Sequence, residues 1–518
     1  MNIKLIATNT IYGDVMNNSF WIDSVGKLDL KNLNNDISTK VCIIGGGITG
    51  ISLAYYLYKN NIDFCVLEKD TIGSKTSGNT TAKITSQHGL IYDYLVNSFG
   101  IEFAKYYYEA NEQAIQNIQN IIEEENIQCD FKLEDSYIYC ETENGNKILK
   151  NEFETLKKLN ISCELVKDIS LPTNSLNAIR FPNQASFHPI KYIYGLCNKI
   201  LTSNKKIYEN TKVIDIVKKS SEYEVKTQKH TVKCKYVVIA SHYPIKDIPG
   251  FYFMKQYQDT SYLIMIEQNT KHFEGIYIKE EIPLLSFRNV HCDNKDYVII
   301  GGSPHKTGTN LNISNSYKLL EETAKKIFPN CKVIYKWNTE DCISLDKIPY
   351  IGEFSNFSNN MYVATGYNKW GMTTSNIAAN ILKDIILGKT NKYEYIYNSK
   401  RFNILKNYKE VFNMSKQTIN SLIIDKLKIQ KDDITNMKND SSKTLKIKGK
   451  IIGIYKDIYG NIYAIKPICS HLKCLLTFNE LDKTWDCPCH GSRFDYTGKS
   501  IYDPSVKNLD IINIKRLL

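Results

Sequence analysis

The sequence lacks the features that would place the protein in a membrane or outside the cell. No uncharged run approaches the roughly 18 residues that a membrane-spanning helix needs. The opening MNIKLIATNTIYGDV has no apolar signal-peptide core. The 14 cysteines among 518 residues are too sparse for a disulfide-rich secreted scaffold. These absences predict a cytoplasmic protein without a membrane span.

Concentrated charge is also absent. The formal net charge is +11, from 66 basic and 55 acidic residues, but the lysines are spread along the whole chain. This distribution is typical of a solvated surface and predicts no nucleic-acid partner. With 42% hydrophobic and 23% charged residues, 518 residues are enough for two or three globular cores.

A strand, a glycine turn, a helix and a second strand are predicted between Lys40 and Leu67. The string Gly45-Gly46-Gly47-Ile48-Thr49-Gly50 fits G-x-G-x-x-G. Its first glycine permits the turn, its second lets the backbone approach a pyrophosphate, and its third lets the helix pack on the sheet. Glu68 follows the next strand, where a carboxylate can accept hydrogen bonds from a ribose. The context favours a dinucleotide site over a turn that binds nothing.

The same pattern returns near residue 362. A strand over 362–364 is followed by Gly366 and Gly371 and then by an apolar-periodic helix from about 374 to 387. Further buried strands are predicted at 236–240 and 297–300, and an amphipathic helix at 101–127.

These segments resemble the glycine oxidase and D-amino-acid oxidase family of FAD-dependent oxidoreductases. The resemblance covers about residues 38–395 and rests further on the segments 77–83, 240–242, 345–352 and 364–373. It implies bound FAD, with the later glycine segment placing a helix N-terminus near the flavin, where the helix dipole stabilises the anionic reduced form. The cofactor-binding residues expected from it are Gly45, Gly46, Gly47, Thr49, Gly50, Glu68, Lys69, Thr80, Thr81, Val213, Gly366, Gly371, Met372 and Thr373.

The resemblance also directs His88, Tyr262, Arg288 and Lys369 toward the flavin or the substrate as candidate catalytic residues. Arg288 is the best candidate for a carboxylate clamp, because its guanidinium can pair bidentately. A packing role is the alternative for each of the four. Cys342 is a candidate for a covalent flavin link, although its spacing to Asp346 differs from that of the amine oxidases.

Cysteine and histidine alternate near the C-terminus. Cys469-Ser-His471 forms a C-x-H arm, and Cys487-Pro-Cys-His490 forms a C-x-x-H arm. These residues could instead bind zinc, but zinc sites more often show two C-x-x-C or H-x-x-x-H arms. In a Rieske [2Fe–2S] centre, two thiolates hold one iron and two imidazoles hold the other. The spacing favours this centre, with Cys469 and Cys487 on one iron and His471 and His490 on the other.

Residues from about 441 to 518 resemble the Rieske family. The resemblance implies that Cys474 and Cys489 form the disulfide that joins the two cluster loops in members of the cytochrome-complex type. Phe494 stands where high-potential members carry a tyrosine that donates to a ligand sulfur, and Lys473 stands where many members have glycine. Losing a donor to sulfur predicts a lower reduction potential.

The expected organisation has four parts. Residues 1–37 form an N-terminal extension, 38–395 the FAD-dependent oxidoreductase domain, 396–440 a helical segment and linker, and 441–518 the Rieske domain. The expected fold class is an α/β (α+β) Rossmann-type FAD domain with an interleaved β-rich substrate domain, followed by a small all-β domain.

The two cofactors suggest a converter between two-electron and one-electron chemistry, because flavin accepts a hydride equivalent and a [2Fe–2S] cluster a single electron. We expect an enzyme that dehydrogenates a small amine or amino acid and passes single electrons through the cluster to a soluble redox partner. One alternative is a reductase fed through the cluster by a ferredoxin-like donor. Another is a redox sensor or electron carrier without turnover.

Overall fold

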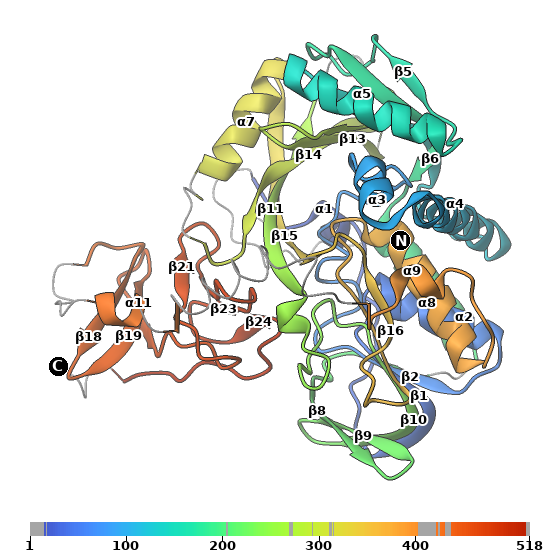
Figure 1. Ribbon diagram of the computed structural model, residues 1–518. Helices are drawn as coiled ribbons and strands as arrows, with labels where there is room; N and C mark the ends of the chain where they lie inside the picture. The colour runs from blue at the N-terminus through green and yellow to red at the C-terminus, as the bar shows by residue number, and fades with distance from the viewer. Residues whose placement is uncertain are drawn as a thin grey trace.

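The computed structural model describes residues 15–16, 18–203, 206–268, 273–292, 294–309, 313, 315–401, 421–422, 425–429 and 437–513 (Figure 1). Within these residues, none of the helices combines the length and the hydropathy that a membrane crossing demands. Much of the expected linker, at 402–420 and 430–436, lies outside the described residues.

A mainly parallel sheet forms the lower part of the molecule in Figure 1. Its order is β16 (Tyr350–Glu353), β17 (Met361–Thr365), β10 (Thr231–Ile239), β1 (Ile37–Ile44), β2 (Phe64–Leu67) and β7 (Lys206–Tyr208), with β9 (Glu222–Thr227) beside β10 and β8 (Val213–Lys219) beside β9. β1 pairs in parallel with both β10 and β2. The last four residues of β1, 41–44, are buried on both faces, as expected for a central parallel strand.

Helices cover one face of this sheet. α2 (Ile48–Lys59) packs against α6 (Pro189–Leu201) and α8 (Gly371–Ile386), and α8 packs against α4 (Ile101–Glu124). Val41 and Ile43 join the core beneath these helices, whereas Cys42 and Ile44 join a second core with residues of β8 and β9. The predicted strands and helices of the two strand–glycine turn–helix units are confirmed.

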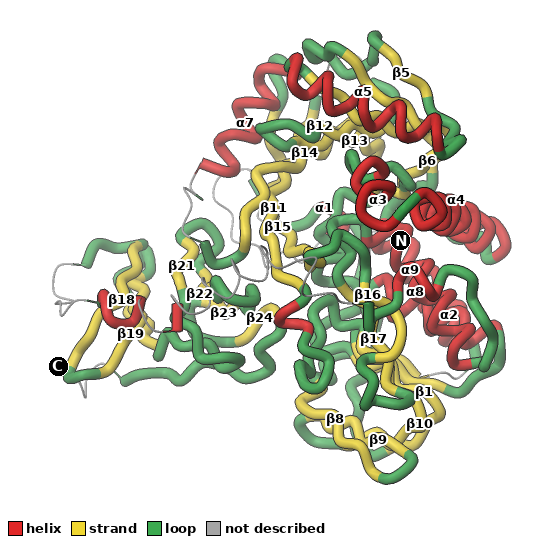
Figure 2. Tube along the Cα trace, in the orientation of Figure 1, coloured by secondary structure: helices red, strands yellow, loops and turns green. Residues whose placement is uncertain are grey.

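A second, mainly antiparallel sheet forms the upper part of the molecule (Figure 2). Its order is β15 (Lys332–Ser344), β11 (Gln256–Glu267), β14 (Lys295–Lys306), β13 (Leu285–Cys292), β12 (Ile276–Lys279), β4 (Lys132–Cys140), β6 (Asn177–Ser186) and β3 (Lys83–Ile84), with β5 (Glu164–Val166) beside β6. α7 (Asn315–Ile327) packs on β11 and β14, and α5 (Glu143–Lys158) packs on β4 and β6; α3 (Tyr92–Phe99) packs on α4 and α5.

The C-terminal region consists of two small sheets. One contains β18 (Ser441–Ile447), β19 (Lys450–Lys456) and β20 (Ile462–Ile465), and the other β21 (Thr477–Asn479), β22 (Thr484–Asp486), β23 (Arg493–Asp495) and β24 (Ser500–Tyr502). Trp485 and Phe494 lie in the core of this region together with the four clustered cysteines. The short helices α9 (Glu394–Tyr397) and α11 (Asp425–Lys428) precede it. The expected fold class is confirmed.

The described part of the N-terminal segment is anchored to the chain that follows it. α1 (Phe20–Asp23) carries the buried Phe20 and Trp21. The Trp21 indole donates a hydrogen bond of 2.7 Å to the carbonyl oxygen of Thr80. The N-terminal segment thereby holds the 77–81 loop in place.

Candidate flavin site and candidate cluster site

The glycine turn after β1 leaves no room for side chains. Gly45 has a φ of +111°, and a Cβ atom there would collide with the carbonyl oxygen of Ala240. A Cβ atom on Gly50 would collide with the carbonyl oxygen of Gly45. The turn therefore brings bare backbone to the N-terminus of α2, where free N–H groups and the helix dipole favour a phosphate. The geometry fits the pyrophosphate of a dinucleotide.

Glu68 lies beside this turn. Its carboxylate accepts hydrogen bonds from the backbone nitrogen atoms of Gly46, at 2.7 Å, and Asp70, at 2.8 Å. Burial raises the pKa of Glu68, while these two hydrogen bonds oppose the rise. Each carboxylate oxygen has a second lone pair, so Glu68 retains the capacity to accept from a ribose hydroxyl.

A cavity of about 650 Å³ extends from the glycine turn to the second sheet. This volume lies within the usual range for a small-molecule or cofactor site. Its wall includes most of the predicted cofactor-binding residues, namely Gly45, Gly47, Thr49, Glu68, Lys69, Thr80, Thr81, Val213, Gly366, Gly371 and Met372. Gly46 and Gly50 belong to the turn without lining the cavity, and the Thr373 hydroxyl is hydrogen-bonded to the His88 ring. The residues present fit FAD.

The cavity near the second sheet is also lined by acidic and basic side chains that were not predicted from the sequence. Burial lowers the pKa of Lys83 to about 7, aided by the charges of Arg288 and Lys369. Burial raises the pKa of Asp341 to about 6 and also raises the pKa of Glu280. All three change protonation state more readily near neutral pH than exposed groups of their kinds do. Lys83 ends the 77–83 segment and Asp341 precedes Cys342, but neither stands in a recognisable motif.

His88, Tyr262 and Lys369 also line the cavity. The Nδ1 atom of His88 lies 2.7 Å from the hydroxyl of Tyr107, and its ring stacks on Trp370 with a centroid distance of 4.7 Å. Burial lowers the pKa of His88 to about 3, so the ring is neutral. Lys369 donates to the Ser261 hydroxyl at 2.8 Å. His88 is thus a neutral, hydrogen-bonded residue of the cavity wall, and its catalytic role stays a prediction.

Arg288 is placed differently. Its guanidinium donates to the carbonyl oxygens of Thr81, Ala82 and Phe187, each at 2.9 Å, and lies over the Trp21 ring at 5.0 Å. Among the described residues it does not belong to the cavity wall. These contacts tie β13 to the loop before β3. The long basic side chains at the wall itself are lysines, such as Lys83 and Lys369.

The cluster residues meet as the spacing predicts. Cys469 and Cys487 are buried together in the core of this region, and the proximity of Cys487 lowers the pKa of the Cys469 thiol. The rings of His471 and His490 lie 5.2 Å apart between centroids, nearly perpendicular. Both Nδ1 atoms are buried and have no hydrogen-bond partner in the part of the chain that the structure describes. Two thiols and two unpartnered imidazole nitrogens match the donor set of a Rieske cluster.

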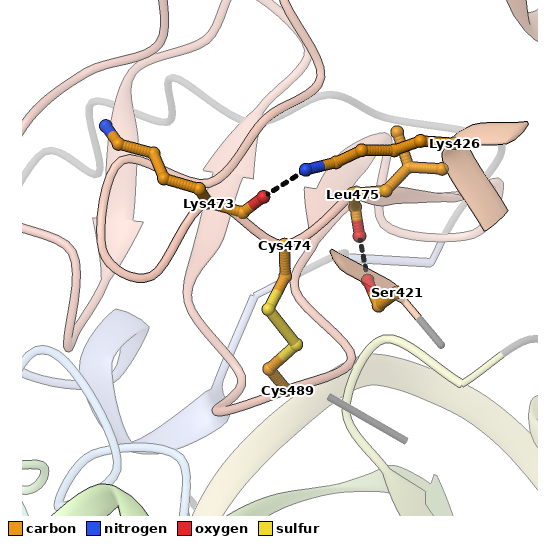
Figure 3. Close-up of a disulfide and its surroundings, with 6 residues drawn as sticks. All are labelled: Ser421, Lys426, Lys473, Cys474, Leu475 and Cys489. Atoms are coloured by element: carbon orange, nitrogen blue, oxygen red, sulfur yellow. Dashed lines mark hydrogen bonds between the residues drawn. A yellow bond between two sulfur atoms is a disulfide. The ribbon is translucent and has the colours of Figure 1, made fainter. Parts of the chain in front are cut away.

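Cys474 and Cys489 form a disulfide between the two cluster loops, which confirms the predicted pair (Figure 3). The sulfur atom of Cys487 lies within 4.8 Å of both, but disulfide sulfurs are not thiolate ligands for a metal. Lys473 has a φ of +65°, a conformation that favours glycine, and its carbonyl oxygen accepts a hydrogen bond of 2.7 Å from Lys426. The two loops are thus joined covalently beside the four candidate ligands.

The C-terminal region packs directly against the flavin cavity. Tyr502, Asp503 and Val506 form part of the cavity wall. Lys69 donates to the Asp503 carboxylate at 3.1 Å, next to the candidate ribose acceptor Glu68. The Gln258 amide donates to the carbonyl oxygen of Asp503 at 2.7 Å. The two candidate cofactor sites therefore share a wall.

Comparison with known proteins agrees with both sites. Residues 40–385 match the family model for FAD dependent oxidoreductases, and residues 429–513 match the model for the Rieske [2Fe-2S] domain. The chain is 34% identical over 496 residues to the Rieske 2Fe-2S iron-sulfur protein YhfW of Bacillus subtilis (strain 168), covering 96% of this chain and 97% of the relative.

Two more distant proteins resemble the flavin part. Gamma-glutamylputrescine oxidoreductase of Escherichia coli (strain K12) is 22% identical over 404 residues, covering 73% of this chain and 91% of the relative. The crystal structure of glycine oxidase from Geobacillus kaustophilus superimposes with a TM-score of 0.60 at 16% identity, covering 71% of this chain and 99% of that chain. The chain belongs to the family of FAD-dependent oxidoreductases and carries a C-terminal Rieske [2Fe–2S] domain.

Proposed function

We propose that the protein dehydrogenates a small amine or amino acid and passes the electrons one at a time, through the Rieske domain, to a soluble acceptor. The observation that carries the proposal is the wall shared by the two sites, in which Tyr502, Asp503 and Val506 of the Rieske domain line the flavin cavity. A domain that only stabilised the fold would not need to contribute residues to the wall of the flavin cavity.

The proposed reaction is a two-electron oxidation of an amine to an imine. The amine loses the hydrogen on its α-carbon with two electrons, as a hydride equivalent, and one further proton from nitrogen, and becomes an imine. When bound, FAD accepts the hydride equivalent and the [2Fe–2S] cluster carries one electron at a time. Two molecules of a one-electron acceptor are therefore reduced for each amine oxidised.

The charged groups at the cavity wall suit an amine substrate. Glu280 and Asp341 can accept hydrogen bonds from the substrate ammonium, and Asp341, with a pKa of about 6, can take up the proton that must leave before oxidation. Lys83 and Lys369 are basic groups of the same wall that can pair with a substrate carboxylate. The name of the Escherichia coli relative, a gamma-glutamylputrescine oxidoreductase, supports the amine class.

An anaerobic titration with a panel of amines and amino acids tests the substrate class. We expect at least one member to bleach the flavin absorbance, and failure of every member would remove this class.

A Cys469→Ser variant tests the electron route. We expect it to retain FAD and substrate-dependent flavin reduction while losing reduction of a one-electron acceptor. Unchanged acceptor reduction in a variant that has lost its cluster would refute the route. FAD content, measured from the absorbance of released flavin, controls for loss of the flavin itself.

A further inference from the structure

The segment 240–255, which follows β10, connects the two candidate sites. At its start, Ala240, Ser241 and His242 line the flavin cavity. Further along, Asp247 and Phe253 contact the two histidines of the cluster loops. The same stretch of backbone therefore touches both sites.

The contact with His471 involves one of its two ring nitrogens and would leave the other to hold an iron. The Nε2 atom of His471 is hydrogen-bonded to the Oδ2 atom of Asp247. The side chains of His471 and Asp247 are 9% and 18% exposed, so water competes little for this bond. The Nδ1 atom of His471 is left without a partner among the described residues. A carboxylate on one ring nitrogen fixes the ring and its tautomer, and leaves the other nitrogen available to a metal.

The contact with His490 is different. The rings of Phe253 and His490 pack edge to face with centroids 5.8 Å apart. The Gln258 amide also donates to the backbone carbonyl oxygen of His490 at 3.1 Å. His490 thus packs on an aromatic ring and lies near the positive charge of Lys306, whereas His471 is hydrogen-bonded to a carboxylate.

Tyr243, in the same segment, lies near residues of both sites. Tyr243 is fully buried, and its hydroxyl has no hydrogen-bond partner within the described parts of the chain. It lies close enough to Cys342, at the cavity wall, and to Cys487, of the second cluster loop, to interact electrostatically with both. The backbone of this loop also packs so tightly on Gly308 that any side chain there would collide with Pro488.

We propose that Asp247 is the positioning residue that holds His471 toward the cluster, fixes the first cluster loop against the wall of the flavin cavity and lowers the cluster potential. The reason for the potential is electrostatic, because a nearby negative charge favours the oxidised cluster, which carries one more positive charge than the reduced cluster. Only the consequence for electron transfer rests on the proposed function.

Three substitutions at this position separate geometry from charge. Asp247→Asn keeps an acceptor oxygen and removes the charge, Asp247→Glu keeps the charge, and Asp247→Ala removes both. Asp215→Asn is the matched control, because Asp215 lies beside the same segment, 3.7 Å from Lys246, but is 54% exposed and does not contact the cluster loops.

The readouts are the reduction potential by protein-film voltammetry and the EPR spectrum after reduction with dithionite, so no substrate is needed. We expect Asp247→Asn to raise the potential with a nearly unchanged EPR spectrum. Asp247→Ala should raise the potential and alter the g values, because it removes both the charge and the hydrogen bond that fixes the ring. Asp247→Glu and Asp215→Asn should stay near the wild-type potential.

Wild-type potentials and spectra in Asp247→Asn and Asp247→Ala would overturn the proposal. If Asp247→Ala loses its iron while Asp247→Glu retains it, the positioning role is supported by the metal content alone. Equal loss of iron from Asp247→Ala, Asp247→Glu and the Asp215→Asn control would refute it. Failure of all amines to reduce the flavin would refute the proposed function but leave these dithionite-based results standing.

Discussion

Replacing Arg493 by methionine removes the guanidinium from a buried charge network that joins the Rieske domain to the flavin domain. Arg493 directly follows the second cluster loop, and its side chain is 2% exposed. It donates to Asp486 at 3.0 Å and to Asp482 at 2.6 Å within its own domain. It also forms an ion pair with Glu340, on β15 of the flavin domain, whose side chain is 0% exposed. Without Arg493, three carboxylates remain together in a poorly solvated interface.

The cost of this substitution follows from burial. Breaking a buried ion pair by removing one partner destabilises a protein by about 3–5 kcal/mol. In a domain of 60–100 residues, each kcal/mol lowers the melting temperature by roughly 4–8 °C. We therefore expect the Rieske-domain transition of Arg493→Met to fall by at least about 12 °C in differential scanning calorimetry.

A second substitution tests the physical reason. Burial raises the pKa of Glu340, so its carboxylate pays a desolvation penalty that Arg493 offsets. Adding Glu340→Gln to Arg493→Met should recover part of the lost stability, because the stranded charge is gone. An Arg493→Met variant whose free energy of unfolding stays within about 0.5 kcal/mol of the wild-type value, the range of an ordinary surface substitution, would refute the reasoning.

Four further substitutions have defined outcomes. Lys473→Gly should raise the free energy of unfolding by about 1–2 kcal/mol, because it relieves a left-handed backbone, and urea denaturation showing no gain would contradict this. Replacing Cys474 and Cys489 by alanine should lower that free energy by about 3 kcal/mol, since the bond closes a loop with a sequence separation of 15; equal urea midpoints would argue against it. Benzoate, used as a simple carboxylate probe, should bind more tightly as the pH falls through about 7, where Lys83 gains its charge. In calorimetric titrations, the Lys83→Met variant should not show this pH dependence. Phe494→Tyr should raise the cluster potential in film voltammetry by restoring a donor to sulfur, and an unchanged potential would contradict it.

The features that could be predicted from the sequence are local ones. The glycine turn is readable because Gly45, Gly46 and Gly50 lie within six residues, and a Cβ atom at each of them would collide with its neighbours. The disulfide and the four candidate ligands are readable because the two arms lie in one short segment, beside Cys474 and Cys489. In both places a fixed spacing dictates the chemistry, whatever the rest of the fold does.

The features that could not be predicted depend on contacts between distant segments. Asp247 and His471 are 224 residues apart, and nothing near either one announces their hydrogen bond. Lys83 and Asp341 both line the cavity although β3 and β15 stand at opposite ends of the second sheet. Arg288 has the chemistry of a carboxylate clamp, but tertiary packing directs its donors to backbone carbonyl oxygens beneath Trp21.

The most direct test of the account is an anaerobic titration of the purified protein with a substrate amine, followed by optical absorption and EPR. We expect the flavin absorbance to bleach and a [2Fe–2S] signal with low g values to appear at the same time. The reason is that the two sites share the wall formed by Tyr502, Asp503 and Val506. Flavin that bleaches beside a cluster that stays oxidised, or stoichiometric zinc in place of the EPR signal, would contradict it.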